Sequence, residues 1–157
     1  MRIETKHIEI FKFNELTDSQ KEKALDNLFN INVDDDFWWS HIYEDAAEIK
    51  CTLESFDIDR GSYCKLNIDC ASTTINTILQ THGENCETYA IASKYKDFIL
   101  NEHGEIDEFH EREFKKELQE EYLAILRREY EYLTSKEAII ETIESNDYEF
   151  TNDGKLY

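Results

Sequence analysis

The 157-residue sequence predicts an α+β fold, in which a small antiparallel sheet is packed by several helices and a long acidic helix lies near the C-terminus. Two observations lead to this prediction. Residues 54–69 alternate hydrophobic and polar side chains around an Arg-Gly-Ser turn, a pattern typical of a β-hairpin. Residues 107–133 instead repeat hydrophobic side chains every three or four positions, which indicates a helix.

The first two elements are predicted from local patterns. Residues 2–13 alternate in polarity, which predicts a strand. Together with the hairpin this strand would make a sheet of at least three strands. Thr17 and Gln20 fit a capping box, and the apolar residues that follow predict a helix over residues 17–30.

The segment VDDDFWW, residues 33–39, is expected to begin a second helix that runs to about residue 52. Apolar residues recur behind it at helical spacing: Trp38, Ile42, Ala46, Ile49 and Leu53. Carboxylates in the first turn of a helix are stabilised by unpaired N–H groups and by the positive end of the macrodipole. Trp38 and Trp39 lie about 100° apart around a helix, so at most one is expected in the core. The other is a candidate partner contact, unless both simply cover the sheet.

The second half of the chain is predicted to be mostly helical. Residues 71–83 and 84–104 both begin with polar residues and end in His-Gly, which indicates two helices. Thr134 and Glu137 suggest a capping box that opens a short helix. Residues 148–157 are predicted to form two brief strands around an Asn-Asp-Gly turn.

Composition and spacing predict a single domain over residues 1–157. The chain contains no proline and only four glycines, so no flexible linker is expected. A local repeat, ILQTHGE at 78–84 and ILNEHGE at 99–105, is interpreted as two helix ends with a left-handed glycine cap. A metal site built from the paired histidines is the alternative interpretation.

The net charge restricts the class of partner. Lysine and arginine number 17 against 36 acidic residues, a formal net charge of −19. Nucleic acid and acidic membrane surfaces would be repelled, whereas a basic protein would be attracted. Residues 1–10 lack the pattern of a secretory signal, and the chain has no apolar run of membrane-spanning length, so a cytoplasmic protein is expected.

Reactive and metal-binding motifs receive little support. The zinc candidates show no close ligand pair: Cys51, Cys64, Cys70, Cys86, His82, His103 and His110. FDIDRGS, residues 56–62, resembles the FDxDGT motif of haloacid-dehalogenase phosphatases, but Arg60 stands where that family has glycine, and a hairpin cannot supply its parallel sheet. We therefore predict no catalytic residue, no metal and no cofactor, and reduced cysteines.

Negative charge is concentrated in two blocks. Residues 33–59 hold nine acidic residues and one basic residue, and residues 97–121 hold ten acidic and three basic residues. Acidic rows on a rigid helix can imitate a phosphate backbone and occupy a basic channel. The predicted partner-binding residues are the following members of these blocks: Asp34, Asp35, Asp36, Trp38, Trp39, Glu44, Asp45, Glu48, Glu108, Glu111, Glu113, Glu117, Glu120 and Glu121. An acidic surface that serves only solubility is the alternative.

Three stretches resemble small, mostly uncharacterised acidic proteins of bacteriophages and prophages. They are FNELTDSQKEKALDNLFNINVDDDFWW (13–39), SFDIDRGSYC (55–64) and YEFTNDGKLY (148–157). The resemblance implies a small accessory protein that acts in the bacterial cytoplasm. Many phage proteins of this kind inhibit host defence, anti-CRISPR proteins among them, and several of those occupy nucleic-acid channels. The resemblance implies this class of function and no role for any individual residue.

We therefore expect a non-catalytic inhibitor that docks on a basic groove of a host nuclease or defence complex. A regulatory or antitoxin-like module would instead bind through an apolar helical face, and salt would not weaken its complex. A metal-dependent hydrolase is a further alternative, and it would hold a divalent ion at Asp57 and Asp59.

Overall fold

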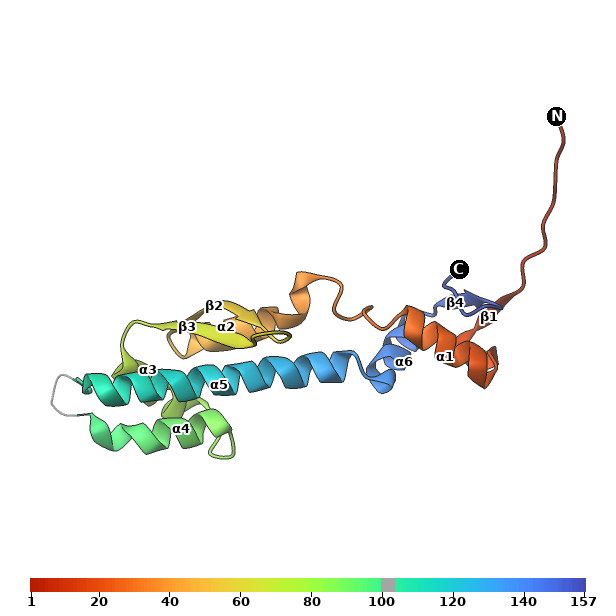
Figure 1. Cartoon of the computed structure of the whole chain (residues 1–157). Coiled ribbons are helices and arrows are strands. Elements are labelled where there is room, and N and C mark those ends of the chain that lie inside the picture. Colours follow the sequence, from red (N-terminus) through yellow and green to blue (C-terminus); the bar gives the residue numbers. More distant parts are fainter. Residues whose placement is uncertain (100–103) are drawn as a thin grey trace. The chain divides into compact units, whose positions relative to one another are not determined.

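The computed structural model describes residues 1–99 and 104–157, and their contacts gather in two compact units (Figure 1). Unit 1 comprises residues 1–38 and 130–157, and unit 2 comprises residues 39–129. Helices are combined with short antiparallel strands, so the predicted α+β class is confirmed. The single domain predicted over residues 1–157 stays a prediction beside this division.

Unit 1 holds two short strands and two α-helices around one core. Its elements are β1 (Ile10–Lys12), the 3-10 helix η1 (Phe13–Glu15), α1 (Asp18–Asn27), α6 (Lys136–Ser145) and β4 (Glu149–Thr151). Strand β1 pairs antiparallel with β4, and Phe11 lies opposite Phe150. The buried core consists of Phe13, Leu16, Ala24, Leu25, Ile139, Ile143 and Phe150. The N-terminal and C-terminal segments of the chain that form unit 1 thus contribute to the same core.

The two helices of unit 1 begin at side-chain caps. Thr17 and Gln20 form the predicted capping box: the Gln20 side chain accepts from Thr17 N at 2.9 Å, and Thr17 Oγ1 accepts from Gln20 N at 3.4 Å. Helix α6 is capped by Ser135, not by Thr134 as predicted. Thr134 is unsuited to this role because its hydroxyl donates to the carbonyl of Tyr130 at 2.8 Å.

Unit 2 holds a β-hairpin and most of the helices. Its elements are α2 (Ser40–Glu48), β2 (Cys51–Asp57), β3 (Tyr63–Ile68), α3 (Ala71–Thr81), α4 (Glu87–Tyr95), the 3-10 helix η3 (Lys96–Phe98) and α5 (Glu108–Leu133), of which residues 130–133 belong to unit 1. The 3-10 helix η2 (Asp36–Trp39) precedes α2. In Figure 1, α2 and the hairpin lie on one side of α5, and α4 lies on the other.

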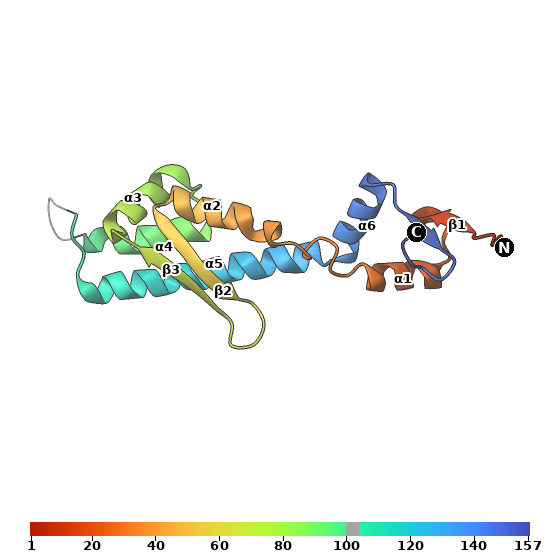
Figure 2. The ribbon, with the colours of Figure 1, turned by 90° about the horizontal axis from the view of Figure 1, so that it is seen from above.

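Helix α5 is the long acidic helix that the sequence predicts, and it supplies much of the core of unit 2. Four of its side chains at three- and four-residue spacing are buried: Phe114, Leu118, Tyr122 and Leu126. The hairpin strands, which pass over α5 in Figure 2, bury Leu53 and Leu66, two partners in the strand register. Leu66 N also donates to Gln119 Oε1 at 3.0 Å, which attaches β3 directly to α5.

The sheet prediction is correct for the hairpin and wrong for the number of strands. Strands β2 and β3 pair as expected, but β1 pairs with β4, so the structure has two separate two-stranded sheets. The predicted N-terminal strand shrinks to Ile10–Lys12. Residues 1–9 are all exposed, so their alternating side chains bury no face that would stabilise an extended strand.

The helix predicted to run from residues 34–36 to about residue 52 is shorter. It begins as η2, continues as α2 and ends at Glu48. Lys50 adopts a left-handed conformation, with φ of 64°, which terminates the helix before β2 begins at Cys51. Leu53 remains buried, but as an inward side chain of a strand. A spacing of four residues, as between Ile49 and Leu53, fits both a helix and a strand, so the hydrophobic pattern could not locate the end of the helix.

The repeated helix ends also differ from expectation. Helix α3 ends at Thr81 and its C-cap is His82, but Gly83 is not left-handed, in contrast to Gly104 with φ of 71°. The second copy of the repeat includes residues 100–103, among them the zinc candidate His103, which lie outside the described residues. Within the described ranges, no helix combines the length and the apolar character needed to cross a membrane.

Candidate partner-binding surface

The acidic residues of α5 occupy more than one face of the helix. A residue advances about 100° around an α-helix, so the buried positions leave the remaining faces to polar side chains. Glu113, Glu117, Glu120 and Glu121 face α4 and line a common groove. Glu111 lines a different hollow, beside Cys70 and Ser72 at the start of α3. Glu108 is exposed at the first residue of the helix.

The groove between α4 and α5 encloses about 460 Å³ and is called the acidic groove below. Its lining consists of Glu87, Ile91, Lys94, Glu113, Lys116, Glu117, Glu120 and Glu121. Five carboxylates thus face two ammonium groups. The contribution of α4 is not predictable from the sequence, because no local motif shows that Glu87 and Lys94 pack beside α5.

Lys94 and Tyr95 partly neutralise the middle of the groove. The Lys94 ammonium forms an ion pair with Glu117 Oε1, and the Tyr95 hydroxyl donates to the same oxygen at 2.7 Å. Burial opposes ionisation of Glu117, but these two hydrogen bonds outweigh it, so the pKa of Glu117 is lowered. The pKa of Lys94 is raised, chiefly by its hydrogen bond to Glu117. Glu117 is therefore ionised and already occupied by an internal cation.

The other groove carboxylates divide into paired and unpaired groups. Arg128 Nη2 lies 2.9 Å from Glu121 Oε1, and that glutamate is largely buried. In the part of the chain that the structure describes, no lysine, arginine or histidine nitrogen lies within 4.0 Å of the carboxylates of Glu87, Glu113 or Glu120. These three side chains are the carboxylates of the acidic groove that remain available to an external cation.

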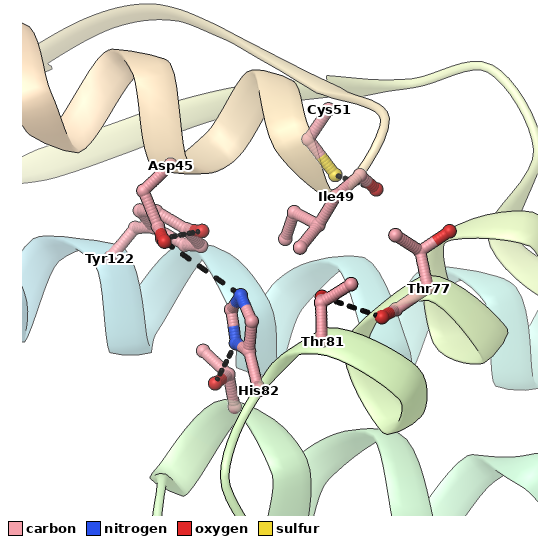
Figure 3. Close-up of polar contacts among 8 residues, drawn as sticks. Asp45, Ile49, Cys51, Thr77, Thr81, His82 and Tyr122 are labelled. Carbon is pink, nitrogen blue, oxygen red and sulfur yellow. Dashed lines mark hydrogen bonds and ion pairs between the residues drawn. The ribbon is translucent and has the colours of Figure 1, made fainter.

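Asp45 has a structural role in unit 2 (Figure 3). The hydroxyl of Tyr122, a fully buried residue of α5, donates to Asp45 Oδ2 at 2.6 Å. The other carboxylate oxygen, Asp45 Oδ1, lies 3.7 Å from His82 Nε2. The second ring nitrogen, His82 Nδ1, lies 2.6 Å from Thr88 Oγ1. The network therefore joins α2, the end of α3, α4 and α5. Burial, reinforced by the hydrogen bond to Asp45, raises the pKa of Tyr122.

The same network borders an open pocket of about 740 Å³. His82, Asp45, Arg128 and the exposed Cys86 are among its lining residues. Both ring nitrogens of His82 face oxygen atoms supplied by the protein, and Arg128 is held by Glu121. Three polar side chains of this pocket, those of Asp45, His82 and Arg128, are therefore engaged in contacts within unit 2.

The remaining predicted carboxylates lie on two units. Glu44 and Glu48 are exposed on α2 in unit 2. Asp34, Asp35 and Asp36 are exposed in unit 1, where Asp35 Oδ1 accepts a hydrogen bond from Phe37 N at 3.1 Å. That contact is an Asx turn at the start of η2, in keeping with a helix-start role. That all the predicted carboxylates contact one partner stays a prediction.

The two tryptophans differ in burial, in agreement with the expectation that at most one lies in the core. Trp38 is 9% exposed and packs in unit 1 against the ring of Tyr130, with 5.7 Å between centroids. Trp39 is half-buried in unit 2 and makes an edge-to-face contact with Phe56 at 5.3 Å. Trp39 is thus the better placed of the two for an external contact.

The residues considered for metal binding are dispersed or used locally. Among residues 1–99 and 104–157, no group of three or more His, Cys, Asp or Glu side chains is arranged to hold a metal ion. Asp57 Oδ1 accepts from Asp59 N at 2.7 Å, so this pair shapes the hairpin turn. All four cysteines are free thiols, with Cys51 and Cys64 buried.

Comparison of the chain with protein-family models, with curated proteins and with solved structures found no match.

Proposed function

We propose that the chain is a non-catalytic binding protein for a basic partner and that the acidic groove between α4 and α5 is its contact surface. One observation supports this most directly: Glu87, Glu113 and Glu120 line one groove, and no cationic side chain of residues 1–99 and 104–157 lies within 4.0 Å of their carboxylates. A carboxylate that has no internal partner keeps its full charge for an incoming lysine or arginine.

The geometry of α5 makes this charge directional. Glu113 and Glu120 are seven residues apart, which corresponds to about 10 Å along a helix axis. The helix is held by four buried side chains and by the Gln119 contact to β3, so these carboxylates have a rigid support. Negative charges at fixed spacing can take the place of phosphates in a channel that normally binds nucleic acid.

The proposed partner is a bacterial nuclease or another effector of host defence. The stretches that resemble phage proteins support a bacterial setting, and the net charge of −19 supports a nucleic-acid-binding groove as the target. Isolated exposed ion pairs contribute only about 0–1 kcal/mol each, so such a complex requires several pairs at once.

The test is capture of bacterial lysate proteins on the immobilised chain at low and at high salt. The groove variant combines Glu87→Gln, Glu113→Gln and Glu120→Gln. The matched control combines Glu137→Gln, Glu141→Gln and Glu144→Gln on α6, which removes the same charge from exposed positions. Glu137 lies in the first turn of its helix, as Glu87 does, so the dipole contribution is matched as well.

A basic protein should be retained by the wild-type chain and by the α6 variant at low salt, and released from both by high salt. The groove variant should retain far less of it. Retention that survives high salt would indicate an apolar interface, as in a regulatory module. Equal retention by the two variants would remove the groove from the proposal.

A further inference from the structure

A second feature of unit 2 combines aromatic rings with negative charge. Trp39, Tyr43 and Phe56 line an open hollow of about 390 Å³. Trp39 and Tyr43 are one helical turn apart at η2 and α2, and Phe56 faces them from β2, the strand on which α2 packs. All three residues are half-buried.

The ring of Phe56 stands at a steep angle to each of the other two rings. Trp39 and Phe56 are inclined by 78° with 5.3 Å between centroids, and Tyr43 and Phe56 by 69° with 6.3 Å. Non-parallel rings around a hollow present π faces from more than one direction. Such a box suits a cation, because the face of an aromatic ring carries the negative part of its quadrupole.

Two carboxylates also line the hollow. Glu54 forms an ion pair with Lys65, whose Nζ lies 2.9 Å from Glu54 Oε2. Asp57 accepts a hydrogen bond from the backbone N–H of Asp59, and no lysine, arginine or histidine nitrogen of the described residues lies within 4.0 Å of its carboxylate. The hollow therefore offers aromatic walls and one uncompensated negative charge at the same place.

We infer that this aromatic hollow receives an arginine side chain of the basic partner. The inference rests on the proposed function in one respect, namely that the partner is basic. A guanidinium group is planar and weakly hydrated, so it can stack on Trp39 or Phe56 while its N–H groups reach Asp57. An ammonium group is more strongly hydrated and cannot stack in this way, so lysine fits the hollow less well.

Two peptides of equal charge, octa-arginine and octa-lysine, separate the hollow from the acidic groove. Both peptides should bind the intact chain through its charge, and octa-arginine should bind more tightly. The arginine preference measured by calorimetry at fixed salt should fall by about twofold to thirtyfold in Trp39→Leu, the range expected for loss of a cation–π contact. Tyr43→Leu should lower the preference in the same direction, and it provides a second reading if Trp39→Leu folds poorly.

Phe109→Leu is the matched control, because it removes an exposed ring of unit 2 that lies outside the hollow. It should leave the arginine preference unchanged. In a Trp38→Phe background Trp39 is the only tryptophan, and its fluorescence should change more with octa-arginine than with octa-lysine.

The outcomes distinguish the two proposals. An arginine preference that is unchanged in Trp39→Leu and Tyr43→Leu would overturn the role of the hollow and leave the acidic groove untouched. Weaker binding of both peptides by the groove variant, with an unchanged preference for octa-arginine, would show that the acidic groove and the aromatic hollow act separately. Failure of the intact chain to bind either peptide would overturn the proposed function itself.

Discussion

The hydroxyl of Tyr122 donates a 2.6 Å hydrogen bond to Oδ2 of Asp45, and it does so from a fully buried residue. The two residues are far apart in the sequence, and one lies on α5 while the other lies on α2. The contact gives Asp45 a structural role in unit 2, and its partner-binding role stays a prediction. A side chain that holds two helices together is poorly suited to act as an adaptable contact for a partner.

Tyr122→Phe should lower the free energy of unfolding by about 1–2 kcal/mol, because a hydrogen bond to a charged acceptor is lost without a change in ring packing. Urea denaturation followed by circular dichroism measures the effect. Tyr63→Phe removes a hydroxyl from an exposed tyrosine of the same unit and should change stability by less than about 0.5 kcal/mol. Equal effects of the two substitutions would contradict a stabilising role for the Asp45 contact.

Gly154→Ala should destabilise unit 1. Gly154 has φ of 77°, and a Cβ atom there would lie 2.9 Å from the carbonyl oxygen of Gln20 and 3.1 Å from Ala24 N. Both are backbone atoms of α1, so the helix or the turn must move. Gly61→Ala isolates the backbone contribution, because Gly61 has φ of 67° and nothing within 4 Å of the added carbon. Gly61→Ala should lower the free energy of unfolding by about 1 kcal/mol, and Gly154→Ala should lower it clearly more. Thermal or urea unfolding measures both changes.

Acid should remove the stabilisation that involves Glu117. The pKa of Glu117 is lowered from its usual value of 4.5 because hydrogen bonds from Lys94 and Tyr95 outweigh the effect of burial. A lowered carboxyl pKa stabilises the folded state above about pH 4.5, and the contribution is lost as the pH falls through the folded-state pKa.

Glu117→Gln should therefore lose less stability than the wild-type chain between neutral pH and about pH 3, as measured by urea unfolding at each pH. Glu113→Gln, at a groove position with no ion pair among the described residues, should follow the wild-type profile. A Glu117→Gln profile parallel to the wild-type one would show that the pair with Lys94 does not contribute to stability.

The cysteines should divide into two reactivity classes. Burial raises the pKa of Cys51 and of Cys64 to about 11, whereas hydrogen bonds from Ser72 and Thr73 lower the pKa of the exposed Cys70. Iodoacetamide at neutral pH should therefore modify Cys70 and the exposed Cys86, with Cys70 the faster of the two.

Mass spectrometry after proteolysis locates the modified thiols. Denaturation in urea should make all four cysteines reactive, which controls for the chemistry of the reagent. Rapid labelling of Cys51 or Cys64 in the native chain would mean that β2 and β3 open readily.

Several elements could be predicted from the sequence because their causes are local. The capping box of Thr17 and Gln20 forms over four consecutive residues, and the hairpin of β2 and β3 needs only its own alternation and turn. The buried stripe of α5 follows from helical spacing, and the acidic character of that helix follows from composition. In each case the interacting groups are close in the chain, so spacing identifies them.

Long-range packing decided the rest. The pairing of β1 with β4 joins the two ends of the chain, and no local pattern distinguishes it from pairing with the hairpin. The acidic groove arises only because α4 packs beside α5, which brings Glu87 and Lys94 to the glutamates of α5. Local rules also cannot tell which carboxylates are neutralised: Glu117 is paired through tertiary structure, whereas Glu113, four residues away, has no ion pair with any of the residues that the structure describes. Charge along the chain was thus determined by the sequence, but the availability of that charge depends on which side chains folding brings within a few ångströms.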